Sequence, residues 1–315
     1  MLILVTGGAG FIGSHVADAL LAAGHEVVVA DDLSSGRRTN VPSDAVFAEI
    51  DIRDGAAVKA LFDNHRFDAI CHQAAQTSVS VSTREPLRDA QINVLGSLNL
   101  LEEARQRDIG RFVFASTGGA IYGEVADGTT ADESVRPQPI SPYACSKLAF
   151  EGYVAAYRHE HGLTATVLRY ANVYGPRQDP HGEAGVVAIF SQRLVAGEPI
   201  RVNAMREPGD DGCVRDYVSV RDVVRANLAA LEGKLEAPVL NVGTGIGTST
   251  RALANAIQRA LGTDAPVADG PRRAGDLERS VLRPHDALPP TVDIAAGIEE
   301  TAHWFRDQAG SSEAS

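Results

Sequence analysis

The glycine-rich segment at residues 7–13 constrains the fold of this chain more than any other feature. It reads Gly-Gly-Ala-Gly-Phe-Ile-Gly and directly follows the apolar run at residues 2–6. Glycines at this spacing allow a tight strand-to-helix turn, and they let backbone N–H groups approach a pyrophosphate at the positive end of the helix. A glycine motif alone is a weak signal, but here a strand precedes it and a helical pattern follows. The predicted cofactor contacts in this turn are Gly7, Gly10, Phe11, Ile12 and Gly13.

Apolar runs and helical patterns alternate regularly over the first 170 residues. Such alternation is typical of parallel strands joined by right-handed crossovers, and it predicts an α/β fold with a doubly wound, Rossmann-like parallel sheet. The predicted strands are 2–6, 26–30, 45–49, 68–72, 111–116 and 164–170. The predicted helices are 11–23, 55–64, 86–108 and 143–161.

After about residue 175 the alternation loosens, and Gly- and Pro-rich stretches separate the elements. The predicted elements are helices near 186–196, 219–232, 249–261 and 295–307 and strands near 200–203, 214–218, 238–242 and 265–268. We therefore predict a dinucleotide-binding domain at 1–175 that carries the catalytic residues. Residues 176–309 are predicted to form mainly a smaller mixed α/β substrate lobe, interleaved with the end of the sheet. Residues 310–315 are predicted to be a disordered tail.

Composition excludes several classes of function. The formal net charge of −12 and the pI near 5.2 argue against nucleic-acid and membrane partners, whose phosphates require a basic face. The three cysteines, Cys71, Cys145 and Cys213, are widely spaced, which predicts reduced thiols in a cytoplasmic protein. The nine histidines show no metal-ligand spacing, so no metal is expected. The apolar start lacks a basic region before it and is predicted to be a strand, not a signal peptide.

The second predicted strand ends at an acidic residue, as dinucleotide sites require. A carboxylate at Asp31 would accept hydrogen bonds from a ribose 2′-OH and repel a 2′-phosphate, which favours NAD over NADP. The alternative is a loop carboxylate that caps a turn. Asp51 and Ile52 follow the third strand and are predicted to lie near the adenine. Asn93 is predicted either to fix the backbone around the cofactor or to be an ordinary helix asparagine.

Tyr143 and Lys147 lie four residues apart in a predicted helix, so their side chains share one face. A free phenol titrates near pH 10, too high for base chemistry at neutral pH. A positive charge about 4 Å away is worth roughly 4 kcal/mol at an effective dielectric near 20. This predicts that Lys147 lowers the pKa of Tyr143 by about three units. The same spacing occurs in many helices by chance, so the pair gains weight only from its context.

Further motifs are distributed along almost the whole chain. They are Phe112-Val113-Phe114-Ala115-Ser116-Thr117, Ile121-Tyr122-Gly123, Ser141-Pro142-Tyr143, Arg169-Tyr170, Asn172-Val173-Tyr174-Gly175-Pro176, Arg215-Asp216-Tyr217 and Arg272-Arg273-Ala274-Gly275-Asp276. With the glycine turn, these motifs resemble the extended short-chain dehydrogenase/reductase superfamily. Within its nucleotide-sugar branch, the chain is most similar to UDP-glucose 4-epimerases.

The resemblance implies roles for the catalytic residues. Tyr143 matches the catalytic base, and Lys147 matches the anchor of the cofactor ribose. The family hydroxyl that hydrogen-bonds the sugar O4 matches Thr117, but Thr117-Gly118-Gly119-Ala120 is one residue longer than the commonest version, and a shifted alignment gives the role to Ser116. Dehydratases and decarboxylases of this branch carry an acidic residue just after the hydroxyl. Glycines stand there in this chain, which favours epimerisation.

The resemblance also implies how the nucleotide is held. Asn172 matches a residue that contacts the UDP phosphates, and Arg215 and Arg273 match arginines that clamp the pyrophosphate. Asp276 matches a contact to the uridine ribose. The alternative for each arginine is an ordinary surface salt bridge. Ser280 falls near a position that walls the sugar pocket, where a small residue leaves room for a 2-acetamido group.

The implied reaction is NAD-dependent inversion of C4 of a UDP-hexose, by transient oxidation to a 4-keto sugar and return of hydride to the opposite face. UDP-N-acetylglucosamine and UDP-glucuronate are alternative substrates. An alternative of another class is a catalytically silent NAD-binding regulator. The family also implies a homodimer formed through the predicted helices 86–108 and 143–161.

Overall fold

The computed structural model describes residues 1–180, 185–235, 237–273 and 275–313. The chain packs into two compact units. The first consists of Met1–Thr117, Pro139–Arg169 and Val223–Leu240, and the second of Gly118–Gln138, Tyr170–Asp222 and Asn241–Ser315. The domain boundary predicted near residue 175 stays a prediction.

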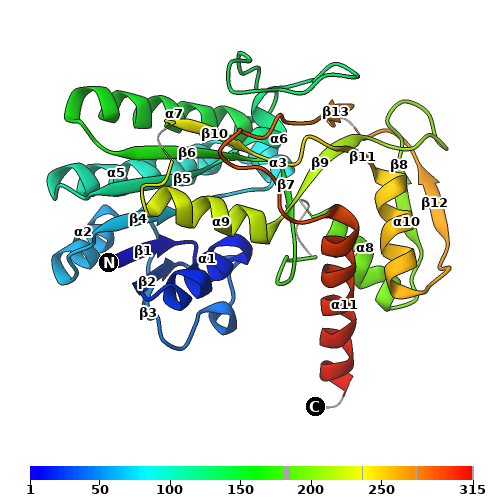
Figure 1. The fold of residues 1–315 in the computed structure, drawn as a ribbon, viewed down its shortest axis with the longest axis horizontal. Helices are drawn as coiled ribbons and strands as arrows, with labels where there is room; N and C mark the ends of the chain where they lie inside the picture. The colour runs from blue at the N-terminus through cyan, green and yellow to red at the C-terminus, as the bar shows by residue number, and fades with distance from the viewer. Residues whose placement is uncertain (181–184, 236, 274, 314–315) are drawn as a thin grey trace. The chain divides into compact units, whose positions relative to one another are not determined.

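A seven-stranded sheet forms the centre of the first unit (Figure 1). Its strand order is β10-β6-β5-β4-β1-β2-β3. The strands are β1 (Leu2–Thr6), β2 (Glu26–Asp31), β3 (Val46–Glu49), β4 (Ala69–His72), β5 (Arg111–Thr117), β6 (Ala165–Tyr170) and β10 (Val239–Val242). The pairs β1–β2, β1–β4, β2–β3 and β4–β5 are parallel. The predicted doubly wound α/β fold is confirmed, and the order reverses between β1 and β4, where such sheets bind ligands.

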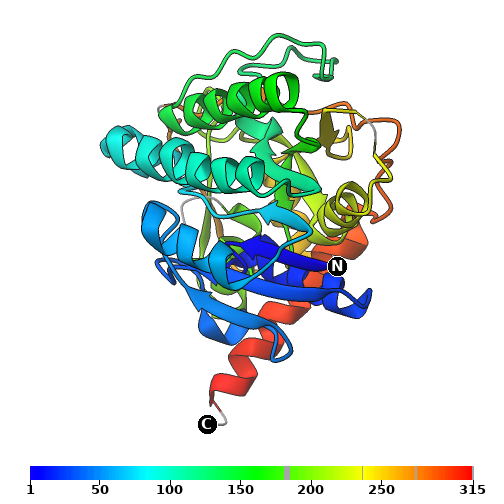
Figure 2. The ribbon, with the colours of Figure 1, turned by 90° about the vertical axis from the view of Figure 1, so that its left-hand side faces the viewer.

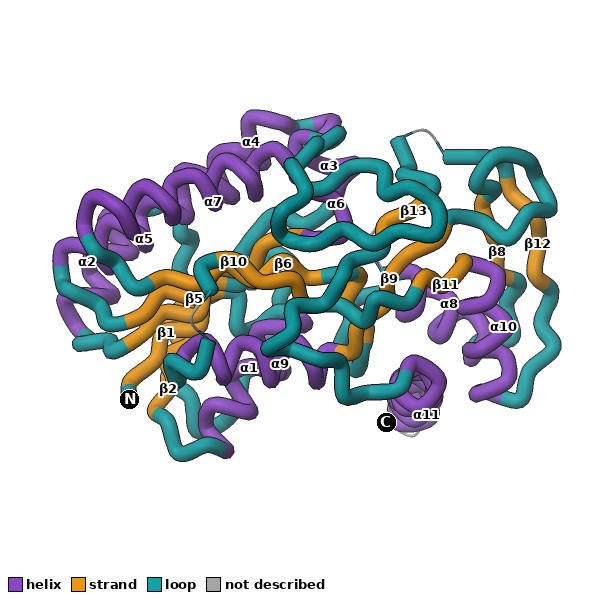
Figure 3. Tube along the Cα trace, turned by 45° about the horizontal axis from the view of Figure 1, so that its top comes forward, coloured by secondary structure: helices purple, strands orange, loops and turns teal. Residues whose placement is uncertain are grey.

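Helices cover both faces of this sheet. Figure 3 shows α2 (Gly55–Asn64), α5 (Ser97–Gln106) and α7 (Pro142–His161) on one face, and α1 (Phe11–Ala22) and α9 (Val220–Leu231) on the other. Figure 2 shows α5 and α7 running side by side. Because the strands are enclosed on both sides, their apolar runs are continuous instead of alternating, and Ile3, Leu4 and Val5 are fully buried.

The predicted helix 86–108 is divided into several elements. They are α4 (Pro86–Ala90), a π-helical turn (Gln91–Gly96) and α5, and α3 (Val79–Arg84) precedes them. A β-carbon on Gly96 would lie 2.8 Å from Ile52 Cγ1, so a larger residue there would force a neighbouring group to shift. The wider π turn also turns Asn93 into the protein, where it is 1% exposed. Single π turns of this kind are frequent at functional sites.

The second unit contains two small sheets and three mutually packed helices. One sheet has the order β11-β9-β13, with β7 also paired to β9, and the other is β12-β8. The strands are β7 (Asn172–Tyr174), β8 (Ile200–Asn203), β9 (Val214–Ser219), β11 (Gly247–Ser249), β12 (Val267–Gly270) and β13 (Arg279–Ser280). The helices are α8 (Val186–Val195), α10 (Thr250–Leu261) and α11 (Ile294–Glu313), preceded by the short α6 (Gly118–Ile121). The short strands β7, β11 and β13 were not predicted from the sequence.

Helix α11 runs past residue 309, into the segment that the sequence predicts to be a disordered tail. A long helix adds further residues at little cost, because its nucleus already exists. Residues 314–315 of the predicted tail lie outside the described residues. Among the described residues, no helix combines the length and the apolar character needed to cross a bilayer. The same part of the chain contains no cluster of side chains suited to a metal ion.

Candidate active site

The three glycines that open α1 are needed for different reasons. Gly7 adopts φ +68°, and a β-carbon there would lie 2.6 Å from Ala74 N. A β-carbon on Gly13 would lie 2.2 Å from Gly7 O, so the turn closes against the helix itself. At Gly10 a β-carbon would meet only Gly7 O, at 3.2 Å. The packing of the protein therefore requires Gly7 and Gly13, whereas Gly10 leaves open space of the kind that a closely approaching cofactor needs.

The first turn of α1 is suited to an anion. Its N-cap is Gly10, and no side chain accepts a hydrogen bond from the first helical N–H groups. Such groups carry the positive end of the helix dipole, and a phosphate group satisfies them. Together with the space at Gly10, this turn fits the pyrophosphate of a dinucleotide. Phe11 and Ile12 are the first two residues of this helix, and their contacts to the cofactor stay predictions.

Asp31 ends β2 beside the glycine turn and is 8% exposed. Its carboxylate accepts a 3.0 Å hydrogen bond from Ala9 N and a 2.9 Å bond from Leu33 N. Burial raises the pKa of Asp31, and these two hydrogen bonds oppose the rise. The side chain therefore holds the loop in place, as the turn-capping alternative predicts. Asp31 also lies at the end of β2, where a carboxylate that binds the cofactor ribose is expected. Its contact with the ribose stays a prediction.

The other predicted adenine-side residues have different environments. Asp51 accepts 2.8 and 3.0 Å hydrogen bonds from Arg53 Nε, and this bond to Arg53 lowers the pKa of Asp51. Ile52 is buried in the core of the unit. Asn93 Oδ1 accepts a 2.9 Å bond from Gln76 N, and Asn93 Nδ2 donates a 2.9 Å bond to Gln76 O. Asn93 thus fixes the backbone that follows β4, and the predicted nearness of this backbone to the cofactor stays a prediction.

Tyr143 and Lys147 lie in the first turns of α7. Ser141 caps this helix by accepting a 3.2 Å bond from Ala144 N, and Pro142 occupies the first helical position. Lys147 is 3% exposed, and its Nζ donates a 2.9 Å bond to Ala115 O. The ammonium also lies 4.7 Å from the centroid of the Phe114 ring. The lysine therefore reaches across to β5.

The prediction that Lys147 lowers the pKa of Tyr143 is wrong for the protein chain alone. Burial raises the pKa of Tyr143 to about 12; a hydrogen bond with Thr117 opposes the rise, and the charge of Asp89 adds to it. Burial lowers the pKa of Lys147 to about 8, against the charges of Asp89 and Glu151. Spacing along a helix predicts only a shared face, whereas burial is the main cause of the pKa shift of each group.

The two candidate hydroxyls at the end of β5 have different partners. Thr117 hydrogen-bonds the Tyr143 side chain. Ser116 Oγ instead donates a 2.5 Å bond to Glu151 Oε1. Glu151 in turn accepts bonds from Arg169, including 2.6 Å from Nη2 and 3.0 Å from Nε. This geometry favours Thr117 as the reacting hydroxyl and gives Ser116 a place in a buried ionic network.

The predicted nucleotide-binding residues lie in the second unit. β13 pairs with β9, which places Ser280 opposite Arg215. Arg215 Nη2 donates a 2.7 Å bond to Leu277 O, and Ser280 Oγ donates a 3.0 Å bond to Gly119 O. A β-carbon on Gly119 would lie 2.9 Å from Asn172 Oδ1. The structure thus brings together Arg215, Ser280, Gly119 and Asn172, which are far apart in the sequence.

Arg273, which is exposed, forms an ion pair with the partly buried Asp276, with Nη2 and Oδ1 3.0 Å apart. Two residues that are predicted to contact the nucleotide are therefore ion-paired with each other. Ion pairs near the surface contribute little to stability, so the exposed Arg273 can exchange partners at small cost. Their contacts to a ligand stay predictions.

Three buried charged residues near the catalytic groups were missed from the sequence. Glu151 and Arg169 form the network under Ser116, and Asp89 is 1% exposed beside the π turn. Glu151 lies four residues after Lys147, and Arg169 is a charged residue in an otherwise uncharged strand. Both signals are present in the sequence, but only the packing shows that these charges are buried.

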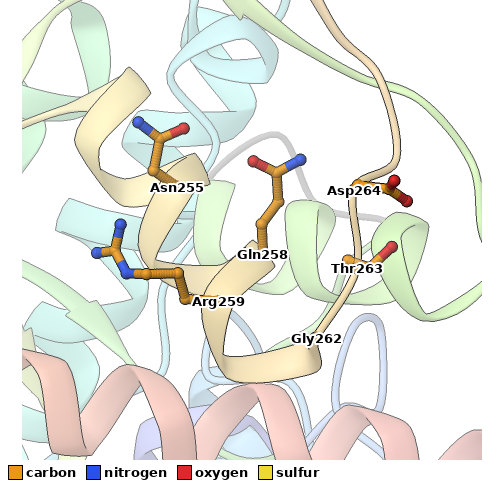
Figure 4. A pocket seen from close by; sticks show the side chains of 6 residues that line it. All are labelled: Asn255, Gln258, Arg259, Gly262, Thr263 and Asp264. Carbon is orange, nitrogen blue, oxygen red and sulfur yellow. The ribbon is translucent and has the colours of Figure 1, made fainter.

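A shallow surface pocket lies in the second unit where α10 ends (Figure 4). Its described lining residues are Asn255, Gln258, Arg259, Gly262, Thr263 and Asp264. None of these is a predicted site residue. The pocket therefore adds nothing to the catalytic site.

Comparison with known proteins agrees with this geometry. Residues 3–243 match the model of the NAD dependent epimerase/dehydratase family. The chain therefore belongs to this family. Among individual relatives, it is 44% identical over 319 residues to the UDP-glucose 4-epimerase of Mycolicibacterium smegmatis, covering 98% of this chain and 100% of that protein.

Two solved structures of UDP-glucose 4-epimerases are also similar. The enzyme of Thermus thermophilus, in complex with NAD, has a TM-score of 0.93 at 51% identity, covering 97% of this chain and 99% of that one. The enzyme of Thermotoga maritima, with UDP-glucose, has a TM-score of 0.93 at 46% identity, covering 98% and 100%. The predicted family, fold class and NAD dependence are confirmed.

The different packing of Gly10 and Gly13 predicts different consequences of substitution. Gly10→Ala is expected to change the free energy of unfolding by less than about 1 kcal/mol but to reduce bound NAD at least about tenfold, because the methyl group enters space open to the cofactor. Gly13→Ala forces a clash with backbone and is expected to cost about 3 kcal/mol of stability. Denaturant unfolding and the NAD content of the purified proteins measure the two effects. Equal NAD content in Gly10→Ala and wild type would contradict this assignment.

Proposed function

We propose that this protein interconverts UDP-glucose and UDP-galactose by inverting C4 of the hexose, with NAD as a retained cofactor. One observation carries the proposal: Thr117 bonds the base Tyr143, and glycines follow Thr117 where dehydratases and decarboxylases of the resembling branch place an acid. The 44–51% identity to UDP-glucose 4-epimerases over nearly the whole chain supports it.

The residues of the first unit handle the proton. Tyr143 accepts the proton of the sugar O4 and later returns it, and Thr117 orients the sugar hydroxyl and shares the hydrogen bond. NAD supplies the reversible hydride acceptor and, when oxidised, a positive charge that favours the Tyr143 phenolate. Lys147 anchors the cofactor ribose and keeps a second positive charge close by. No proton or electron is consumed over a full cycle.

The residues of the second unit are proposed to hold the nucleotide. Arg215 and Arg273 suit the pyrophosphate, because guanidinium groups bind phosphate oxygens in pairs. Asn172 and Asp276 are proposed to contact the phosphates and the uridine ribose. A firm grip on UDP and a loose grip on the hexose would let the sugar present both faces, so the binding energy is concentrated away from the reacting carbon.

The alternative sugars remain distinguishable by experiment. Ser280 is small and 2% exposed, and its hydroxyl is engaged by Gly119 O. A small residue there is compatible with a 2-acetamido group as well as a hydroxyl. The rival of another class, a silent NAD-binding regulator, is disfavoured because Tyr143, Lys147 and Thr117 are all present.

The direct test is turnover by the purified protein with no NAD added. UDP-galactose, UDP-N-acetylgalactosamine and UDP-galacturonate are incubated in parallel, and the product is identified by chromatography. We expect UDP-galactose to give UDP-glucose at the highest rate, as the similarity to UDP-glucose 4-epimerases suggests. Turnover without added NAD is expected because the cofactor is retained and recycled. If none of the three sugars were converted even with NAD supplied, the proposal would be wrong.

We also propose that the protein is a homodimer formed by α4, the π turn and α7. The side chains of Leu87, Leu95 and Tyr153 on these elements are 79%, 58% and 44% exposed. The exposed positions of α7 at Cys145, Ala149, Gly152 and Ala156 are small and uncharged. Apolar exposure of this kind marks an interaction surface.

Light scattering on the purified protein should give twice the chain mass. Leu95→Glu is expected to yield monomers, because it places a charge in the proposed interface. Val46→Glu, at a 53% exposed position on edge strand β3, should leave the dimer intact. A monomeric wild-type protein would refute this arrangement. The three cysteines are free thiols, which is consistent with the cytoplasmic location that we propose.

A further inference from the structure

A buried carboxylate near the catalytic pair has an oxygen with no partner. Asp89 is 1% exposed, and its Oδ1 accepts bonds of 2.8 Å from Gln76 Nε2 and 3.1 Å from Asn93 Nδ2. Its Oδ2 is buried and has no hydrogen-bond partner. A buried, unsatisfied charged oxygen costs free energy, so its position calls for a functional explanation.

Asp89 is connected to the turn of α7 that carries the catalytic residues. Asn93 Nδ2, which donates to Asp89, also lies 3.2 Å from Ser146 Oγ. Ser146 stands between Tyr143 and Lys147, and its Oγ donates a 2.9 Å bond to Tyr143 O. A short chain of hydrogen bonds therefore links Asp89 to α7 at the level of the catalytic pair.

The partners of Asp89 leave its charge uncompensated. Both of its donors are neutral amides, whereas Glu151, the other carboxylate acting on Lys147, is ion-paired to Arg169 at 2.6 Å. From β4, His72 also faces Lys147, but burial lowers the pKa of His72 to about 3, so it is neutral. From β5, the Ala115 carbonyl accepts a hydrogen bond from Lys147, and the Phe114 ring lies 4.7 Å from its ammonium. Asp89 is therefore the uncompensated negative charge among these groups.

We propose that Asp89 is a positioning residue that keeps Lys147, the proposed anchor of the cofactor ribose, protonated at neutral pH. The catalytic consequence of this inference rests on the proposed function, whereas the effect of Asp89 on Lys147 does not. The negative charge of Asp89 raises the pKa of both Lys147 and Tyr143. Without it, the ammonium would lose its proton nearer to physiological pH.

The composition of the chain allows a direct test. The sequence contains three lysines, Lys59, Lys147 and Lys234, and the side chains of Lys59 and Lys234 are 62% and 69% exposed. Protein labelled with [ε-13C]lysine therefore gives three resonances, assigned with Lys59→Arg and Lys234→Arg variants. Each is titrated between about pH 6 and 11 in the wild type and in Asp89→Asn, which retains one carbonyl oxygen for Gln76 and Asn93.

We expect the titration of Lys147 to move down by about one pH unit in Asp89→Asn, the lower end of the effect of one nearby charge. Lys59 and Lys234 should not move. Glu85→Gln, which removes an exposed charge at the start of α4, should leave all three unchanged. Gln76→Met breaks a hydrogen bond to Asp89 but keeps its charge, so it should also leave Lys147 near its wild-type value.

An unchanged Lys147 titration in Asp89→Asn would overturn the proposal, as would an equal shift in Gln76→Met, which would indicate a structural role. If Asp89→Asn does not fold, Asp89→Ser removes the same charge with a smaller side chain that still accepts a hydrogen bond. The pH profile of turnover in the holoenzyme should also shift to lower pH in Asp89→Asn. If the wild-type enzyme converted no UDP-sugar, the proposed function would fail, while the lysine titration would still decide the role of Asp89.

Discussion

Replacing Tyr143 with phenylalanine is expected to lower kcat for UDP-galactose by about 10³-fold, within the range that a positioned acid–base group contributes. The substitution removes only the phenol oxygen, which is hydrogen-bonded to Thr117. No other group of the first unit described above can take its place: His72 is fully buried and hydrogen-bonded to Thr6 and Ser97, and Lys147 is directed at Ala115 O. The remaining rate should reflect the orientation of sugar and cofactor alone.

The measurement is steady-state turnover, together with the NAD content of the denatured protein and the KM for the sugar nucleotide. NAD content and KM should stay within about threefold of wild type, because the phenol contributes to the transition state more than to binding. Tyr153→Phe is the matched control, since Tyr153 lies on the same helix with its side chain 44% exposed. Its kcat should not change. Wild-type turnover by Tyr143→Phe would falsify the assignment of the base.

The sequence predicted the framework of the site because its signals are local. A glycine turn between strand and helix requires only neighbouring residues, and the structure gives a separate packing reason for Gly7 and for Gly13. The six strands expected before residue 175 are present within one or two residues of their predicted bounds. The place of Asp31 at the end of β2 could also be predicted from neighbouring residues, and Asp31 lies beside the glycine turn.

The electrostatics of the site could not be predicted in the same way. The spacing of Tyr143 and Lys147 fixes which helix face they share, but not where the long lysine side chain ends, and it ends at β5. Asp89 and Glu151 each lie on a helix, where a lone charge is by default a solvated one. Their burial depends on tertiary packing around the π turn and β6, which no local pattern records.

Adjacent hydroxyls pose a similar problem. Ser116 and Thr117 are both buried at the end of β5, and sequence alignment could assign the catalytic role to either. The structure separates them by partner: Thr117 bonds Tyr143, and Ser116 bonds Glu151. The preference for Thr117 therefore depends on a carboxylate 35 positions away from Ser116, which sequence spacing alone could not identify.

Breaking the ion pair between Arg169 and Glu151, the acceptor of the Ser116 hydrogen bond, is expected to have a large effect on stability. Arg169 and Glu151 are both 6% exposed, and Arg169→Met leaves the Glu151 carboxylate buried without a counter-charge. We expect the free energy of unfolding to fall by about 3–5 kcal/mol, the usual cost of breaking a buried pair by removing one partner. Glu151→Leu should be similarly costly, because it leaves the guanidinium unpaired. Chemical denaturation monitored by circular dichroism measures both changes.

The double variant separates two contributions to stability. One is the cost of leaving a single buried charge unpaired, and the other is the stabilisation that the Arg169–Glu151 pair provides. Arg169→Met with Glu151→Leu removes both charges, so it should recover most of the stability lost in either single variant, as apolar replacements of buried pairs often do. Arg88→Met breaks the exposed pair with Glu85, whose side chains are 50% and 48% exposed, and should cost less than about 1 kcal/mol. If the double variant were as unstable as the sum of the two single variants, the loss would come from packing and the electrostatic explanation would be wrong.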